Sequence, residues 1–262
     1  MTDAVAPDPD WLVPDWRLPG VGAVMTTRAG GVSGPPFDRL NLRAGIGDDA
    51  LAVAHNQRLL ARAIGTAPVV LDQVHGAAVV RLSAADALPG AAVRRADASV
   101  TTEFGIACSI QTADCLPVLF AAPEGRAVGA AHAGWRGLAL GVLEATVREV
   151  CDAAGCAPQA LHAWLGACIG PGRFEVGADV LEAFGASPRE VAPRHFAPVR
   201  EGKWLADLPA LARERLGAAG VTRVSGGQWC TVSDPSRFFS YRRDGVTGRM
   251  AAVVWRHGNR ND

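Results

Sequence analysis

Residues 112–120 read TADCLPVLF, and residues 127–137 read AVGAAHAGWRG. Both contain short apolar runs of the length that buried strands have, so they predict two strands of a sheet. Cys115 stands directly before the first run, and His132 stands just before the glycine-rich end of the second. Side chains at the ends of strands, next to glycine or proline, lie at the rim of a sheet. We therefore expect a thiol and an imidazole at the rim.

Strands and helices are mixed along the rest of the chain. The expected strands cover residues 20–27, 105–110, 116–121, 126–134 and 161–170, with two β segments in 68–83 that break at His75 and Gly76. The expected helices cover residues 48–65, 138–155 and 205–220, with a loop and short helix in 171–185 and a C-terminal β-hairpin in 237–256. Gly65 is expected as a helix C-cap. Without regular βαβ alternation, this order predicts an α+β fold in a single domain, residues 16–262, behind a loose N-terminal arm, residues 1–15.

The composition excludes several classes of protein. Of the 262 residues, 49% are hydrophobic and 20% charged, as in globular proteins. The 26 basic residues balance 26 acidic ones, so no overall field recruits nucleic acid or an anionic membrane. No apolar run is long enough to span a bilayer, and the acidic start lacks the features of a signal peptide. We therefore expect a cytoplasmic protein whose six cysteines are free or metal-bound.

Three side chains suit a metal ion: His75, Cys115 and His132. Two imidazoles and one thiolate are good ligands for zinc, and they leave a fourth position open to water, as catalytic zinc sites do. The three residues are far apart in sequence and match no compact zinc motif. The spacing alone therefore leaves open a structural interpretation, in which the histidines pack in the core and the cysteine is a buried free thiol.

Eight motifs follow one another across nearly the whole chain: TRAGGVS, LNL, GDD, QVHG, TADCLPV, AAHAGWRG, GPGRFEVG and SRFFSYRRDGVTGRMAAVVW. In this order they resemble the bacterial laccase-domain family, whose older name is polyphenol oxidase. The resemblance implies a layered α/β/β/α sandwich with mixed sheets, formed by one laccase-like domain over residues 16–262. It also implies one zinc per chain, held by His75 of QVHG, Cys115 of ADC and His132 of AHAGWRG.

The resemblance further implies a purine nucleoside phosphorylase acting on adenosine, inosine, guanosine and methylthioadenosine, with adenosine deamination as a companion activity. Purine nucleosides and phosphate are then the expected partners, and His75, Cys115 and His132 the catalytic residues. Attack of zinc-activated water on C6 of adenosine would give inosine. The H-x-E and P-C-x-x-C signature of other zinc deaminases is absent, so this would be an independent solution. Phosphorolysis needs instead a phosphate held below the sugar.

Several polar residues in these motifs are candidates for binding substrate. The HAGWRG segment leads into a helix, so its N–H groups and Arg136 would receive a phosphate. Asp114 would orient a ligand or shuttle a proton, Glu175 would act as an acid or base or accept a ribose hydroxyl, and Gln73 would read a base edge. The N-terminal motifs supply the remaining candidates for phosphate or ribose contacts: Arg28, Asn41, Arg43 and Arg58. Each has an ordinary interpretation as a turn or surface residue.

Other functions fit parts of the sequence. Cys115 as nucleophile with His132 as base would make a cysteine hydrolase or amidase, which suits the editing of peptidoglycan precursors. Copper oxidation of phenols, implied by the older family name, often adds an axial methionine to two histidines and a cysteine, but only Met1, Met25 and Met250 exist. There is no H-x-H pair for a multicopper cluster either. A closed, four-ligand zinc site would instead indicate a binding module.

Overall fold

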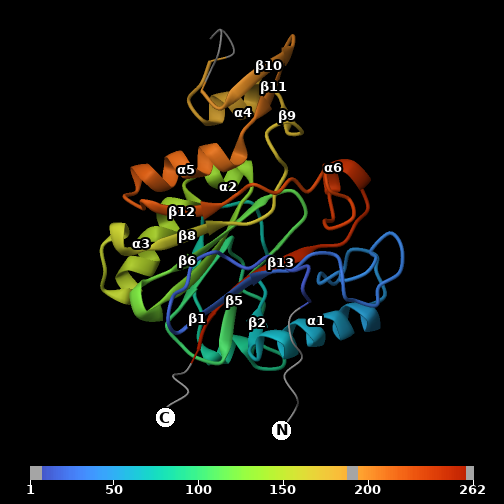
Figure 1. Ribbon diagram of the computed structural model, residues 1–262, viewed down its shortest axis with the longest axis vertical. Coiled ribbons are helices and arrows are strands. Elements are labelled where there is room, and N and C mark those ends of the chain that lie inside the picture. The colour runs from blue at the N-terminus through green and yellow to red at the C-terminus, as the bar shows by residue number, and fades with distance from the viewer. Residues whose placement is uncertain (1–7, 188–193, 258–262) are drawn as a thin grey trace.

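Two β-sheets face each other in the middle of the molecule, and helices cover their outer faces (Figure 1). The computed structural model describes residues 8–187 and 194–257. The first sheet has the strand order β1 (Val21–Met25), β13 (Met250–Arg256), β5 (Ile106–Thr112) and β2 (Ala67–Val69). The second has the order β12 (Arg223–Gly226), β8 (His162–Leu165), β6 (Leu116–Ala121), β7 (Val128–Ala133), β4 (Ala98–Thr101) and β3 (Val79–Arg81).

Both sheets are mixed. In the first, β13 is antiparallel to β1 and β5, while β2 is parallel to β5. In the second, the central strands β8, β6, β7 and β4 are antiparallel, and the edge strands β12 and β3 are parallel to their neighbours. A small third sheet protrudes with α4 (Ala178–Ala183) at one end of the molecule (Figure 1). Its strand order is β10 (Phe196–Arg200), β11 (Lys203–Ala206) and β9 (Glu175–Val176).

Strand β6 shows why the central strands read as unbroken apolar runs. Successive side chains of a strand point to opposite faces. Val118 and Phe120 pack beneath the helices α3 (Val142–Ala154) and α5 (Leu208–Ala218). Leu119 and Ala121 pack between the two sheets instead. Both faces of the strand are buried, so the expected α/β/β/α layering is confirmed.

Helix α1 (Ala50–Ile64) covers the outer face of the four-stranded sheet, where Leu60 and Ile64 lie in one cluster with residues of β1 and β13. It begins at Asp49, whose carboxylate accepts the N–H groups of the first turn, and it ends at Gly65 with a φ of 68°. The predicted C-cap is therefore confirmed. The remaining helices are α2 (Trp135–Ala139) and α6 (Tyr241–Asp244), with 3-10 turns at η1 (Ala84–Ala87), η2 (Pro123–Gly125) and η3 (Pro158–Ala160).

The chain crosses between the two central sheets at the two motifs singled out from the sequence. Strand β2 belongs to the four-stranded sheet and β3 to the six-stranded one, and QVHG, which includes His75, lies in the crossing between them. Strands β5 and β6 are likewise in different sheets, and residues 113–115 make that crossing. These crossings place both motifs where the two layers meet.

Three expectations from the sequence need correction. The predicted C-terminal hairpin is wrong, because residues 237–249 form α6 and loops, and β13 pairs with β1 and β5. The N-terminal arm is not loose from Asp8 onward: Trp11 and Leu12 are buried, and Leu12 exchanges two backbone hydrogen bonds of 2.8 Å with Met25. The rest of the expected arm, residues 1–7, lies outside the described residues. Strands β4, β9, β10, β11 and β12 had not been expected.

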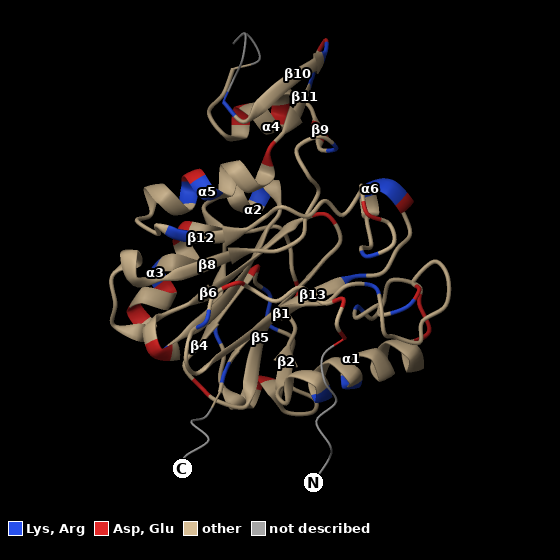
Figure 2. Ribbon diagram, in the orientation of Figure 1, with Lys and Arg blue, Asp and Glu red and all other residues tan. Residues whose placement is uncertain are grey.

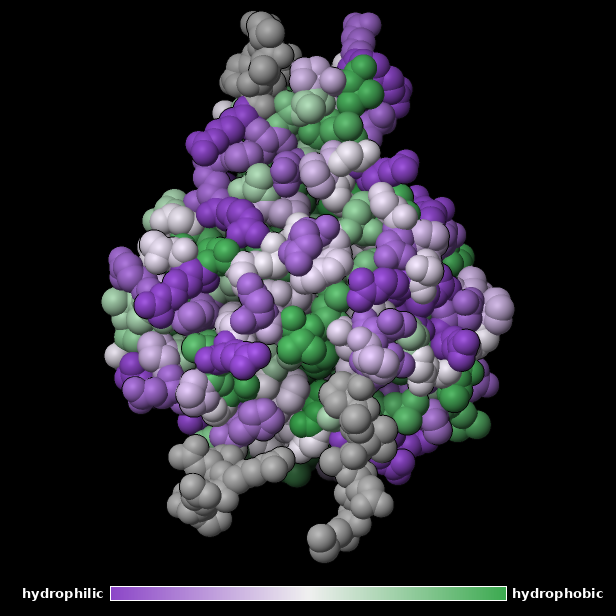
Figure 3. All heavy atoms as spheres, in the orientation of Figure 1, coloured by the Kyte–Doolittle hydropathy of each residue, from purple (hydrophilic) through white to green (hydrophobic). Residues whose placement is uncertain are grey.

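The surface carries both charge signs in alternation. Figure 2 shows blue and red positions scattered over the ribbon, and Figure 3 shows polar and apolar side chains intermixed on one face. Within the described residues, no helix combines the length and apolar character needed to cross a membrane.

Candidate functional site

The antiparallel register of β6 and β7 brings Cys115 and His132 together. Pro117 is the partner of His132 and Leu116 that of Ala133, so Cys115, one residue earlier, lies beside Gly134. A Cβ at Gly134 would be 2.9 Å from the Cys115 Sγ, closer than side chains pack. The glycine of the AHAG motif is therefore needed for the close approach of the thiol.

His75 reaches the same place from the other crossing. Its backbone φ is 62°, in the left-handed region that non-glycine residues seldom adopt. The Cys115 Sγ lies 3.7 Å from the His75 Nε2, and the ring centroids of His75 and His132 are 4.7 Å apart. We call these three residues the triad. His75 and Cys115 lie on the two crossings between the sheets, and His132 lies near the end of strand β7.

The triad has the spacing of a metal site. Its ligand atoms all lie within 4.8 Å of one another. Two ligands of a tetrahedral zinc ion, at bonds of about 2.0–2.3 Å, are roughly 3.3–3.8 Å apart. The separation of Cys115 and His75 falls in that range. His132 is buried, Cys115 is partly exposed and His75 is exposed, so one side of the triad faces open space.

A buried carboxylate supports the triad. Asp97, which no sequence motif had indicated, lies directly before β4 and accepts a hydrogen bond of 2.9 Å from the His132 Nδ1. Because Nδ1 is used in this way, Nε2 is the ring nitrogen left for a ligand. Burial opposes ionisation of Asp97, but the hydrogen bonds from His132 and the Gly76 N–H outweigh it and lower the pKa of the carboxyl.

The thiol and the imidazole favour each other's charged forms. Burial opposes ionisation of Cys115, but hydrogen bonds from His132 and His75 overcome it and lower the pKa of the thiol to about 6. Burial likewise opposes protonation of His132, but Asp97 and Cys115 raise its pKa to about 9. A thiolate is the form in which cysteine binds a metal or acts as a nucleophile.

Two cavities adjoin the triad. The wider one has a volume of about 440 Å³ and is lined by all three members, together with Arg43 and Arg249. Neither arginine forms an ion pair with any residue in the described ranges. Burial and the neighbouring Arg43 guanidinium lower the pKa of Arg249. Two close cations without a carboxylate between them make this cavity suited to an anion.

The narrower cavity has a volume of about 180 Å³ and shares His75 and Cys115 with the wider one. Its walls are largely apolar and aromatic, formed by Trp135, Ile169, Phe174 and Leu208. Arg136 and Arg242 also line it, and the Arg136 guanidinium lies 4.4 Å from the centroid of the Trp135 ring. Tyr241 of α6 borders both cavities. The triad therefore lies where a cationic space meets an aromatic one.

Five of the residues singled out from the sequence as substrate ligands lie at this site or support it. Arg43 and Arg136 line the cavities. Asp114 lines the narrower one, but its carboxylate oxygens already accept hydrogen bonds from the Thr231 hydroxyl at 2.5 Å and the Arg242 N–H at 2.6 Å. It therefore anchors α6.

Asn41 is completely buried, and it holds the backbone of the cationic cavity in place. Its Oδ1 accepts the N–H groups of Arg43 and Arg249, at 3.1 and 2.9 Å. Gln73 lines the wider cavity, but its amide is occupied by both backbone groups of Gln111. Both residues position backbone groups of other residues, and neither amide can turn toward a base edge without breaking these hydrogen bonds.

The other three residues do not line either cavity. Arg28 is tied to Asp38 and to the Pro235 carbonyl, with its guanidinium over the Phe239 ring. Arg58 is exposed on α1. The Glu175 carboxylate pairs with Arg200 at 2.6 Å in the protruding sheet. The structure assigns these three no contact with the triad.

Arg249, Tyr241 and Arg242 were missed as site residues, although all three lie in the last quoted motif. The signal that could have found Arg249 is its place directly before the strand 250–256. Cys115 had been singled out for the same reason, because it lies directly before a strand. Asp97 likewise lies directly before the buried strand β4, which was not predicted from the sequence.

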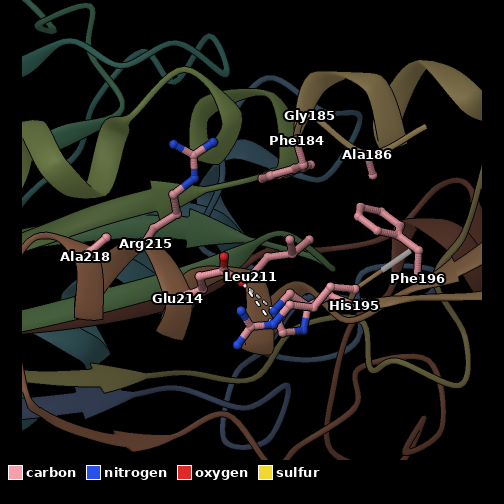
Figure 4. A pocket seen from close by; sticks show the side chains of 10 residues that line it. Phe184, Gly185, Ala186, His195, Phe196, Leu211, Glu214, Arg215 and Ala218 are labelled. Carbon is pink, nitrogen blue, oxygen red and sulfur yellow. Dashed lines mark hydrogen bonds and ion pairs between the residues drawn. The ribbon is translucent and has the colours of Figure 1, made fainter. Parts of the chain in front are cut away.

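A separate cavity of about 400 Å³ lies between α4, β10 and α5, away from the triad (Figure 4). Its charged side chains neutralise one another. Glu214 contacts the His195 Nε2 at 2.6 Å and the Arg194 Nε at 3.6 Å, and Arg215 pairs with Glu144. No residue predicted as a ligand lines it, so we assign the functional site to the triad.

Comparison with known proteins identifies the family. Residues 22–257 match the family described as multi-copper polyphenol oxidoreductase laccase. The chain belongs to this family. It is 51% identical over 246 residues to a Pseudomonas aeruginosa protein named purine nucleoside phosphorylase, covering 94% of this chain and 98% of that one. The Escherichia coli purine nucleoside phosphorylase YfiH is 47% identical over 248 residues, covering 93% and 98%.

Solved structures of this family share the fold. The crystal structure of a Neisseria meningitidis protein superposes with a TM-score of 0.86 at 45% identity, covering 95% of this chain and all of that one. YlmD of Geobacillus stearothermophilus gives a TM-score of 0.87 at 33% identity, covering 98% of each chain. The resemblance inferred from the motifs is therefore confirmed.

Proposed function

We propose that this protein is a zinc-dependent purine nucleoside phosphorylase that acts on adenosine, inosine, guanosine and methylthioadenosine, and that it also deaminates adenosine. The observation that carries the proposal is the position of the triad between a cavity with two uncompensated arginines and a cavity with aromatic walls. One space suits phosphate and the other a purine. The names of the similar P. aeruginosa and E. coli proteins support the same activity.

The wider cavity is the proposed phosphate site. The Arg249 guanidinium donates to the carbonyls of Thr247 and Gly248, which fixes its direction, and the N–H groups of both Arg43 and Arg249 are anchored on Asn41. The fixed guanidinium of Arg249 and the guanidinium of Arg43, which lines the same cavity, match the oxygens of a phosphate. In phosphorolysis this phosphate attacks C1′ of the ribose while the base leaves from the other face.

The donor set supports zinc as the metal. Two imidazoles and a thiolate held near tetrahedral spacing suit zinc, and the exposed side of the triad leaves room for a further ligand. When bound there, zinc supplies Lewis-acid activation of water at neutral pH, which is the chemistry that deamination at C6 requires. The chain contributes the ligands and the Asp97 carboxylate that orients His132.

Copper chemistry is less well supported by the surroundings. Met25 and Met250 are both completely buried among the residues between the two sheets, and neither lines the cavities at the triad. Met1 lies outside the described residues. The lack of a methionine among the described residues that line these cavities supports zinc over a blue-copper centre with an axial methionine.

A specific observation also favours the cysteine hydrolase as a second candidate. Cys115, His132 and Asp97 follow one another as a thiolate, an imidazole and a buried carboxylate, the order used by hydrolytic cysteines. His75 distinguishes the two candidates, because a hydrolase has no need of a second imidazole 3.7 Å from its nucleophile. A zinc-bound thiolate is also a poor nucleophile.

Incubation of the pure, metal-quantified protein with adenosine, with and without phosphate, tests the proposal. We expect inosine without phosphate, and free base with ribose 1-phosphate only when phosphate is added. Base release that is equally fast without phosphate would make the enzyme a nucleoside hydrolase. If no nucleoside reacts and native Cys115 is readily alkylated, the cysteine hydrolase replaces the phosphorylase.

A further inference from the structure

One buried carboxylate holds two of the three proposed zinc ligands. The Oδ1 atom of Asp97 accepts the backbone N–H of His75 at 2.8 Å and the Nδ1 of His132 at 2.9 Å. Its Oδ2 atom accepts the N–H groups of Val74 at 3.2 Å and Gly76 at 2.7 Å. The side chain is completely buried, so all four donors come from the protein.

The three N–H groups are consecutive, and together they enclose the carboxylate. Such successive N–H groups form an anion-binding concavity when a residue in the left-handed region lies among them. His75 is that residue, with a φ of 62°. The backbone conformation that directs the His75 ring toward Cys115 is thus held by the Asp97 carboxylate, which lies on a different connection, directly before β4.

The same carboxylate also sets the chemistry of His132. Its bond to Nδ1 requires a proton on that nitrogen, so Nε2 is the nitrogen that would give up its proton and bind a metal. The backbone of the two residues is joined as well, since the His132 N–H donates to the Asp97 carbonyl at 2.7 Å. Asp97 therefore contacts the ring of His132 and the backbone of His75.

We propose that Asp97 is a positioning residue that forms the metal site before the metal binds, by fixing the ring of His132 and the loop of His75 at the same time. This inference rests on the proposed zinc site, and not on which nucleoside the enzyme takes. Without the metal, the triad keeps its geometry because the hydrogen bonds from the four N–H donors to Asp97, and not the ion, hold the two histidines in place.

The variant Asp97→Asn tests the proposal, because it keeps the volume and one acceptor oxygen. Its NH₂ group would face N–H donors where a carboxylate oxygen now accepts them. We expect the zinc dissociation constant, measured by competition with a chromophoric chelator, to rise about 10–100-fold. The absorption bands of the cobalt(II)-substituted protein should also shift, which a change in folding stability alone would not cause. Unchanged affinity with an unchanged cobalt spectrum would overturn the proposal.

Asp72→Asn is the matched control. Asp72 lies on the connection between β2 and β3 that carries His75, and its half-exposed carboxylate is 3.9 Å from the Arg95 guanidinium. We expect wild-type zinc affinity and a wild-type cobalt spectrum for this variant. A loss of zinc affinity as large as that of Asp97→Asn would show that any charge removed near the His75 loop weakens the site, and would overturn the specific role of Asp97.

A measurement on the wild-type protein covers the case in which Asp97→Asn does not fold. In hydrogen exchange, the amides of Val74, His75 and Gly76 should remain protected after zinc is stripped. If they exchange freely until zinc returns, the ion forms the loop and the proposal fails. None of these readouts uses a nucleoside, so a failure of the proposed enzyme activity would leave them interpretable.

Discussion

Two cavities of similar volume, about 440 and 400 Å³, contain histidine and arginine side chains and use them in opposite ways. Beside α5, His195 and Arg194 both contact Glu214, so the charges compensate one another (Figure 4). At the triad, the buried carboxylate is matched to backbone N–H groups and to His132, while Arg43 and Arg249 stay uncompensated. The same residue types therefore form a candidate ligand site only where the fold leaves arginines without an ion-paired carboxylate.

The largest difference that we expect between the two cavities is in the amount of bound zinc. Alanine at His75, Cys115 or His132 should each reduce bound zinc from about one per chain to below about 0.1, because two protein ligands hold the ion too weakly. Nucleoside turnover should fall by more than about 100-fold. Elemental analysis and product assays would measure both.

His195→Ala is the control, since it removes a histidine from the compensated cavity. Zinc content and turnover should stay at wild-type values. Retention of stoichiometric zinc after two different triad substitutions would contradict the metal site.

The next largest effect is on phosphate. Arg43→Ala should raise the KM for phosphate about 10–100-fold, because a hydrogen bond to a charged group contributes about 1.5–3 kcal/mol. Deamination measured without phosphate should change by less than about 2-fold, because the arginine contacts the anion and not C6.

Arg58→Ala is the matched arginine variant, and initial-rate kinetics with varied phosphate would compare the two. Arg58 is exposed on α1 and lines neither cavity, so its removal should leave the KM for phosphate unchanged. An equal effect of both substitutions would mean that overall positive charge, and not the cavity, attracts phosphate.

Much of the fold could be predicted from the sequence, because burial imposes a local pattern. Strands such as β6 are buried on both faces and read as continuous apolar runs, and α1 combines helical periodicity with Gly65. The C-terminal segment was misread because its aromatic residues pack in the core through loops. Phe238 and Phe239 are completely buried without belonging to a strand.

The candidate site was likewise predictable only in part. The motifs gave His75, Cys115 and His132, but Asp97 and Arg249 act through contacts made by residues far apart in the chain. Arg249 and Asn41 are 208 positions apart, yet their hydrogen bond shapes the cationic cavity. Residue type does not distinguish Arg58 from Arg43. Arg58 is exposed on α1, whereas Arg43 lines the wider cavity, and this difference depends on the fold.

A smaller effect should come from packing at the triad. Gly134→Ala places a Cβ 2.9 Å from the Cys115 Sγ and 3.1 Å from the His75 Cδ2. Overpacking of this kind costs about 1–3 kcal/mol, so the zinc dissociation constant should rise about 10-fold. Gly217→Ala on α5 meets nothing within 4 Å and should instead stabilise the fold by about 0.4–1 kcal/mol. Equal zinc affinity in the two variants would show that the triad has room to adjust.

The smallest effect is expected in the compensated cavity. Glu214→Gln breaks the contacts with His195 and Arg194, yet the Glu214 side chain is 46% exposed, so solvent already screens these pairs. The loss of unfolding free energy should stay below about 1 kcal/mol, as for surface ion pairs. Zinc content and both nucleoside activities should remain at wild-type values, because Glu214 has no contact with the triad. Thermal unfolding and the product assays measure the two parts separately. A large loss of activity without a loss of stability would mean that this cavity is coupled to the triad through the protruding sheet, since Phe174, directly before β9, also lines the aromatic cavity.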